Sequence, residues 1–241
     1  MTSAQAHLGI LMLDSQFPRI LGDVGNPRTW DFPVRYEIVT GATPASVVLE
    51  NPAPLLEEFV KAGHKLVAAG CSGIATTCGF LAPMRQRLAD SLGVPVAASA
   101  LEQAAGIQTS LPSGRQVGVL TIARESLGQR DLEAAAVPKG TPIAGVDTSD
   151  FARSILGNSD KLDVAAARRD ICEAAVKMRQ DHPTLGAILL ECTNMVPYAP
   201  DVARAAKLPV YSIYSYLTWF HAGLVPASFP EGARNQSPSN V

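Results

Sequence analysis

The chain has 241 residues, of which 47% are hydrophobic and 17% are charged. A chain of this length can bury a large hydrophobic core without disulfides or structural metals. Its 20 basic and 22 acidic residues give a net charge of −2, and this balance disfavours nucleic acid and anionic membranes as partners. The N-terminal segment lacks the basic start and the long apolar core of a secretory signal, so we expect a cytoplasmic protein.

Short apolar strands alternate with amphipathic helices along the chain. The uncharged run at 66–84 is long enough to suggest a membrane span, but its glycines, hydroxyl residues and cysteines favour a buried strand and a turn. In chain order we expect a strand at 8–13, a loop at 16–33, a helix at 53–69, a strand and turn within 66–84, a helix ending near Gly93, a strand opening at Pro95, a strand at 117–122, a helix at 164–180, a strand and turn around Cys192, a helix ending near Lys207, a strand opening at Pro209 and a helix within 211–224.

The two halves of the chain contain an internal repeat. Three distinctive residues of the first half recur in the second at a constant offset of 114 residues, namely Cys78 as Cys192, Pro83 as Pro197 and Pro95 as Pro209. The two copies align with each other without a gap. We infer a duplicated unit of strand, helix and strand.

This alternation predicts an α/β fold with two pseudo-symmetric, doubly wound domains built on parallel sheets. The first domain is expected to comprise residues 1–111 and 212–227, and the second residues 112–211. Residues 228–241 are rich in Pro, Ser and Asn, so we expect a loose tail there. Ligands of such sheets bind beyond the carboxyl ends of the strands, and the active site is therefore expected between the two domains.

The chain has four cysteines but no C-x-x-C pair and no histidines at zinc-finger spacing. It also lacks glycine-rich phosphate loops and the H-E-x-x-H motif. We therefore expect neither a metal nor a cofactor. Cys71 and Cys172 are interpreted as core residues, whereas the repeat favours a catalytic role for Cys78 and Cys192.

Each repeated cysteine follows a predicted strand and precedes a predicted helix. The amino terminus of a helix favours negative charge, so we expect it to lower the thiol pKa and to hold a carboxylate. Two thiols on opposite sides of one carbon suit stereoinversion, because one can remove a proton while the other delivers one.

The segments around the two cysteines, Ala75-Thr-Thr-Cys78-Gly-Phe-Leu and Leu189-Leu-Glu-Cys192-Thr-Asn-Met, resemble the two motifs of the aspartate/glutamate racemase superfamily. The resemblance extends from Gly9 to about Tyr216 and implies two flavodoxin-like domains around the active site. It implies that Cys78 and Cys192 are the catalytic thiols of a cofactor-independent racemase or epimerase. Its substrate would be a small carboxylate-bearing or hydantoin-like compound.

The resemblance also implies substrate-binding residues. Backbone and hydroxyl groups of four residues in the two turns would bind a carboxylate: Thr77, Gly79, Thr193 and Asn194. Asp14 and Ser15, just after the first strand, resemble an acidic and serine turn that orients substrate in glutamate racemases. The loop 16–33 has the composition of a lid and equally that of a dimer contact.

Several alternatives remain open. Asn194 stands where glutamate racemases usually carry histidine, which disfavours the cell-wall glutamate racemases. A maleate-type cis/trans isomerase or an arylmalonate-type decarboxylase would use the same scaffold. The decarboxylases have only one catalytic cysteine, so the two cysteines of this chain make that alternative less favoured. A small-molecule binding module without catalysis is a further alternative. We also expect a homo-oligomer, because symmetric dimers are the commonest assembly.

Overall fold

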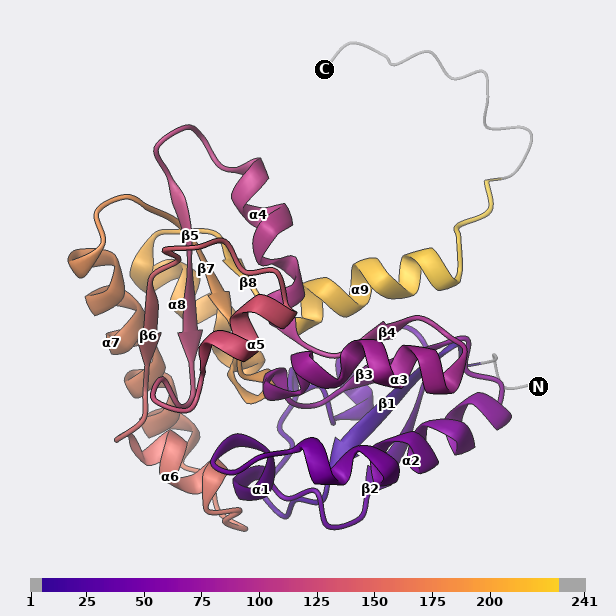
Figure 1. Ribbon diagram of the computed structural model, residues 1–241. Coiled ribbons are helices and arrows are strands. Elements are labelled where there is room, and N and C mark those ends of the chain that lie inside the picture. The colour runs from indigo at the N-terminus through magenta and orange to yellow at the C-terminus, as the bar shows by residue number, and fades with distance from the viewer. Residues whose placement is uncertain (1–5, 230–241) are drawn as a thin grey trace.

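The computed structural model describes residues 6–229 and contains two lobes, each built around a four-stranded parallel sheet (Figure 1). The strand orders are β2-β1-β3-β4 and β6-β5-β7-β8, so the two sheets share one topology. This confirms the predicted α/β fold with two doubly wound parallel sheets.

The first sheet places the strand predicted at 8–13 at its centre. Gly9, in that strand, leaves room for Ile74 and for Leu66 of α2. Gly73 faces Phe220 and Leu224 of α9, and because side chains alternate along a strand, α9 covers the opposite face of this sheet from α2. The elements up to the end of the first sheet are β1 (Leu8–Leu13), η1 (Pro27–Thr29), β2 (Val34–Val39), α1 (Pro44–Val48), η2 (Ala53–Leu55), α2 (Leu56–Ala68), β3 (Gly73–Thr76), η3 (Gly79–Met84), α3 (Arg85–Leu92) and β4 (Val96–Ala97).

The second lobe repeats this arrangement. Gly118 of its central strand packs beneath Met178, which lies on the longest helix of the lobe. The remaining elements are η4 (Ala100–Gln103), α4 (Ala104–Ser110), β5 (Gln116–Thr121), α5 (Gln129–Ala134), β6 (Ile143–Gly145), α6 (Asp150–Leu156), α7 (Val164–Asp181), β7 (Leu185–Leu190), η5 (Thr193–Tyr198), α8 (Ala199–Ala206), β8 (Val210–Tyr211) and α9 (Ile213–Leu224).

The repeat is conserved in the structure. The bounds of η3, α3 and β4 recur in η5, α8 and β8 with the same displacement of 114 residues. Both helices end on a residue in the left-handed conformation, Gly93 with φ of 67° and Lys207 with φ of 50°. The shared offset therefore extends from the cysteines to the helix ends.

The last helix, α9, returns toward the first lobe, as expected for the segment 211–224. Tyr214 stacks on Trp30, and His221 stacks on Phe32, at centroid distances of 5.4 and 3.7 Å. The domain boundaries given above remain predictions. Most of the predicted tail, residues 230–241, lies outside the described residues. Within residues 6–229, no helix is both long and apolar enough to span a bilayer.

Candidate active site

Cys78 and Cys192 occupy equivalent positions in the two lobes. Strand β3 ends two residues before Cys78, and β7 ends two residues before Cys192. Both cysteines are buried and cap a six-residue 3-10 helix. Each sulfur accepts a hydrogen bond from the backbone N–H two residues later, that of Phe80 or of Asn194. The backbone therefore presents both thiols in the same way.

The two cysteines line one cavity between the lobes. Its volume is about 20 Å³, enough for about one water molecule. Residues from the loop after β1, from α1 and from α6 line it together with the two cysteine turns. A cavity of this volume holds no small organic acid unless lining side chains move. The cavity is lined by Leu13, Phe17, Arg19, Pro44, Val48, Thr77, Cys78, Gly79, Phe80, Ile122, Ile155, Leu156, Glu191, Cys192, Thr193 and Asn194.

Burial dominates the ionisation of both thiols. It raises the pKa of Cys78 and of Cys192, and the nearby Glu191 carboxylate raises both further. Cys78 itself also raises the pKa of Cys192, so ionisation of one thiol opposes ionisation of the other. The expectation that a helix terminus lowers these pKa values is wrong for this structure. A short 3-10 helix follows each cysteine, and desolvation outweighs the single backbone hydrogen bond.

Glu191 is a buried carboxyl group that the sequence analysis gave no role. It directly precedes Cys192, and its residue is 1% exposed. Burial raises its pKa to about 7, against a hydrogen bond from Thr121 Oγ1 at 2.7 Å that favours the charged form. The site therefore contains a carboxyl group that titrates near neutral pH.

Gly79 is required by this carboxyl group. A Cβ atom at Gly79 would collide with the side chain of Glu191 and lie 2.9 Å from its backbone oxygen. Glu191 thus reaches from the end of β7 to the turn at Cys78, and it neighbours one cysteine in sequence and the other in space. A buried acidic residue between an apolar strand and a repeated cysteine was the available sequence signal.

The other predicted turn residues also line the cavity, but their side chains are engaged with protein groups. The Thr77 hydroxyl accepts a hydrogen bond from Leu13 N–H at 3.1 Å. Thr193 Oγ1 donates to the carbonyl oxygen of Thr77 at 2.8 Å, and Asn194 Nδ2 donates to Asp23 Oδ2 at 2.7 Å. These hydrogen bonds join segments of different lobes or loops. Substrate binding by these residues remains a prediction.

Asp14 and Ser15 lie outside the group of cavity-lining residues. Asp14 is exposed, and one of its carboxylate oxygens accepts the N–H of Gly41 at 3.5 Å. Ser15 Oγ accepts a hydrogen bond from Arg19 Nη2 at 2.9 Å. Ser15 therefore bonds to a residue that lines the cavity, whereas the side chain of Asp14 bonds to Gly41, which does not line it.

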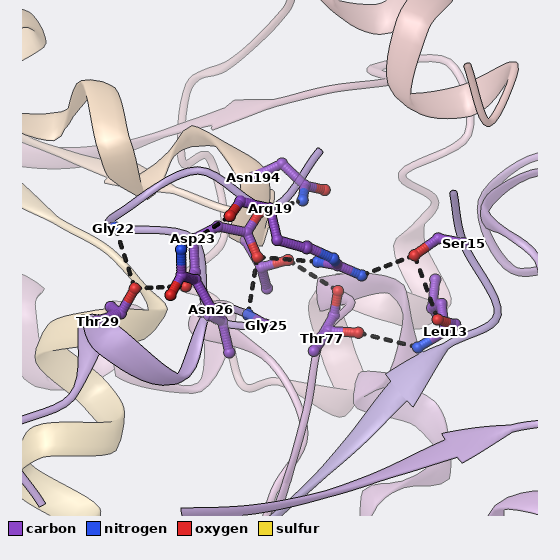
Figure 2. Close-up of polar contacts among 12 residues, drawn as sticks. Leu13, Ser15, Arg19, Gly22, Asp23, Gly25, Asn26, Thr29, Thr77 and Asn194 are labelled. Carbon is purple, nitrogen blue, oxygen red and sulfur yellow. Dashed lines mark hydrogen bonds and ion pairs between the residues drawn. The ribbon is translucent and has the colours of Figure 1, made fainter. Parts of the chain in front are cut away.

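The loop after β1 contributes a buried polar network (Figure 2). Arg19 and Asp23 form an ion pair at 3.0 Å, with side chains 14% and 4% exposed. Asp23 also accepts the hydrogen bond from Asn194 of the second lobe. Gly22, with φ of 98°, packs against Pro197, where a Cβ would lie 3.0 Å from the proline Cα. The loop thus bridges both lobes above the cavity.

The remaining cysteines are placed away from the cavity lining. Cys71 is buried and Cys172 is half-buried, in keeping with their interpretation as structural residues. Within the described part of the chain, no cluster of three or more His, Cys, Asp or Glu side chains is arranged to hold a metal ion.

Curated proteins of similar sequence are dimethylsulfoniopropionate (DMSP) lyases. DMSP lyase 7 of Emiliania huxleyi (strain CCMP1516) is 28% identical over 228 residues, covering 90% of this chain and 67% of that protein. The DMSP lyase of Durusdinium sp. clade D is 26% identical over 236 residues, covering 91% and 75%. No protein-family model matches the chain.

Solved structures resemble this chain over more than nine-tenths of its length. Allantoin racemase from Klebsiella pneumoniae superposes with a TM-score of 0.65 at 14% identity, covering 94% of each chain. A glycine-to-cysteine mutant of arylmalonate decarboxylase in a sulfate-associated form gives 0.62 at 17% identity, covering 93% of this chain and 96% of that one. The chain has the fold of the aspartate/glutamate racemase superfamily. Glutamate racemase from Francisella tularensis subsp. tularensis SCHU S4, in complex with D-glutamate, gives 0.57 at 12% identity, covering 93% and 85%. The superfamily fold is thus shared across proteins with different named activities.

Proposed function

We propose that this chain is a cofactor-independent lyase in which a cysteine thiolate removes the α-proton of a small carboxylic acid that carries a leaving group on its β-carbon. DMSP is the first substrate to test. The observation that carries the proposal is that both repeated cysteines line one small cavity. The relatives named DMSP lyases, which match about nine-tenths of the chain, support the choice of substrate.

The proposed reaction is a β-elimination. The thiolate of Cys78 or Cys192 takes the α-proton, and the electron pair of the C–H bond forms the double bond between the α- and β-carbons. The bond from the β-carbon to sulfur breaks, and dimethyl sulfide leaves with the electron pair of this C–S bond. The products are acrylate and dimethyl sulfide, and the proton on the thiol is released to water. The step needs no oxidant or reductant.

The site has features that suit one thiolate at a time. The backbone N–H groups of Phe80 and Asn194 favour the thiolate forms of Cys78 and Cys192. The Cys192 thiol also donates to Asn194 Oδ1 at 3.7 Å, which favours its neutral form. Repulsion between the two sulfurs disfavours a second ionisation. One cysteine therefore serves as the base while the other remains a thiol that can donate a proton.

The cavity also carries groups of both charges. Arg19 contributes a cation, and Glu191 contributes a carboxyl group that titrates near neutral pH. A substrate with a carboxylate and a positive group satisfies both, whereas a neutral hydantoin satisfies neither. This pairing favours zwitterions such as DMSP or an amino acid.

Racemisation or epimerisation at the α-carbon is a second candidate. It begins with the same proton removal, but the second thiol returns a proton to the opposite face and no bond to the β-carbon breaks. The presence of a cysteine in each of two matching turns favours it, because elimination alone requires a single base. The two candidates differ in the fate of the carbanion.

The test is incubation of the purified protein with DMSP in D₂O without added cofactor, followed by ¹H NMR. Elimination predicts acrylate and dimethyl sulfide signals, and their absence from Cys78→Ser/Cys192→Ser, with Cys172→Ser as the matched control. A parallel panel of L- and D-amino acids measures loss of the α-proton signal. Acrylate from DMSP supports the lyase, and exchange with inversion of an amino acid supports the racemase. Full turnover by the double variant would contradict both.

A further inference from the structure

Arg19 is a cavity-lining arginine whose guanidinium is held in place by neighbouring residues of its own loop. It lines the cavity, and its side chain is 14% exposed. Its Nη1 pairs with Asp23 and its Nη2 donates to Ser15, as Figure 2 shows. The Cζ atom lies 4.4 Å from the centre of the Phe17 ring. A Cβ atom at Gly25 would lie 3.0 Å from the Nε atom, so the guanidinium packs closely against this glycine.

One donor of this group lacks a partner. Among the described residues, the side-chain nitrogens and oxygens that are both buried and without a hydrogen bond are Arg19 Nε and Tyr198 Oη. Leaving a buried donor of a charged group unsatisfied is costly, so such an atom in a native structure requires an explanation. Tyr198 is not a lining residue, whereas Arg19 lies in the cavity wall.

We propose that Arg19 binds the carboxylate of the substrate, an inference that rests on the function proposed above and extends it to the substrate anchor. Nε and Nη2 lie on the same edge of the guanidinium, and two donors on one edge match the two oxygens of a carboxylate. On binding, the carboxylate accepts from the unpartnered Nε and replaces Ser15 at Nη2. Nη1 keeps its bond to Asp23, which holds the guanidinium in orientation.

The charges and contacts of the cavity leave Arg19 as the anchor. Among the described residues that line it, Arg19 is the one Lys, Arg or His. The side chains of Thr77, Thr193 and Asn194, from which carboxylate binding was predicted, already bond to Leu13, to a carbonyl and to Asp23. Of the three, Asn194 also helps to position the anchor, because it holds Asp23, the ion-pair partner of Arg19.

The binding experiment uses propionate and its neutral isostere propionamide on the whole protein, with titration calorimetry as the readout. Wild type is expected to bind propionate more tightly than propionamide. Arg19→Met is expected to weaken propionate binding about 10- to 100-fold, the range for charge-assisted hydrogen bonds, and to leave propionamide unchanged. Arg28→Met removes an exposed cation of the same loop and is expected to change neither.

Arg19→Lys provides a second variant that keeps the positive charge beside Asp23. It loses the paired donors of one edge, so an intermediate loss of propionate affinity is expected. Unchanged propionate affinity in Arg19→Met or Arg19→Lys, or equal affinity of wild type for the two probes, would overturn the anchor.

The turnover of DMSP separates this inference from the proposed function. If wild type binds propionate through Arg19 but releases no dimethyl sulfide, the lyase proposal fails and the anchor stands. If dimethyl sulfide is released and Arg19→Met leaves KM unchanged, the anchor fails and the lyase stands. A raised KM with a smaller change in kcat supports both.

Discussion

The two cysteine turns share a backbone but differ in their side chains. Each begins two residues after a central strand, and each sulfur accepts an N–H two residues later. At equivalent positions, however, the side chains of the first turn are smaller or less polar than those of the second. The pairs, in the order first turn to second, are Thr77 and Glu191, Gly79 and Thr193, and Phe80 and Asn194.

This difference shows how a duplicated scaffold becomes an asymmetric site. The second turn reaches outward: Glu191 extends to Gly79, Thr193 to the backbone of Thr77, and Asn194 to Asp23. The first turn supplies the space that receives Glu191 and the carbonyl that receives Thr193. The thiols are therefore presented alike but have different surroundings, and we expect them to play unequal parts.

The largest expected effect comes from removing either thiol. Cys78→Ser and Cys192→Ser keep the size of the side chain but remove the readily ionised base, so each is expected to lose at least about 10²-fold in kcat on the natural substrate. α-Proton exchange in D₂O should survive to different extents in the two variants. Equal residual exchange in both would contradict unequal parts, and full activity of one variant would show a single-thiol enzyme.

A second effect is on stability and concerns the carboxyl group found in one turn only. Glu191 has its pKa raised from 4.5 to about 7, so the folded protein holds a proton that the unfolded chain releases. Folding stability should therefore fall as pH rises from about 4.5 to 7, by up to about 3 kcal/mol from this group.

Urea unfolding of wild type and Glu191→Gln across this pH range measures that effect. Glu102 also has its pKa raised to about 7 and contributes to the fall in both proteins, so the difference between the two curves isolates Glu191. The variant should gain stability relative to wild type as pH rises. A constant difference across the range would show that the pKa of Glu191 is the same in the folded and the unfolded protein.

The third prediction concerns the space that Gly79 leaves for the Glu191 side chain, which would be filled by a Cβ atom. Gly79→Ala places a Cβ against the Glu191 carboxyl group, and overpacking of this kind costs about 1–3 kcal/mol. Gly106→Ala, in α4 with open space around it, is the matched control and should be neutral or slightly stabilising. Thermal unfolding compares the two, and equal melting temperatures would contradict the close approach.

The smallest expected effect concerns the bond that joins the turns. Thr193→Val removes the hydrogen bond to the Thr77 carbonyl and is expected to cost about 1 kcal/mol. Thr218→Val removes a comparable bond on an exposed helix and should cost less. Denaturant unfolding of both variants measures the difference. Unchanged stability in Thr193→Val would show that the contact between the turns contributes nothing measurable.

The fold was largely predictable because its signals are local or repeated. The uncharged run 8–13 is β1, and the offset of the cysteines and prolines extends to the helices that follow them. The 3-10 geometry after each cysteine was missed. The prolines Pro83 and Pro197 lie inside these short helices, and a regular α-helix begins only after them.

The polar network above the cavity was not predictable from the sequence. The loop that carries Arg19 and Asp23 does not belong to the sequence repeat. Asp23 accepts a hydrogen bond from Asn194, which lies 171 residues further along the chain. Local patterns carry no information about such a pairing. Asp14, selected from the resemblance, is exposed, whereas Arg19, four residues beyond Ser15, occupies the cavity wall.

The central claim is that Cys78 and Cys192 work together in one cavity. A bifunctional thiol reagent, 1,3-dibromoacetone, tests it most directly when bridging and DMSP turnover are followed in the same sample. Peptide mapping should find a single bridge that joins Cys78 to Cys192, and activity should fall in proportion to the bridged fraction. Full turnover in the bridged protein, or a bridge formed instead through Cys71 or Cys172 with loss of activity, would contradict the account.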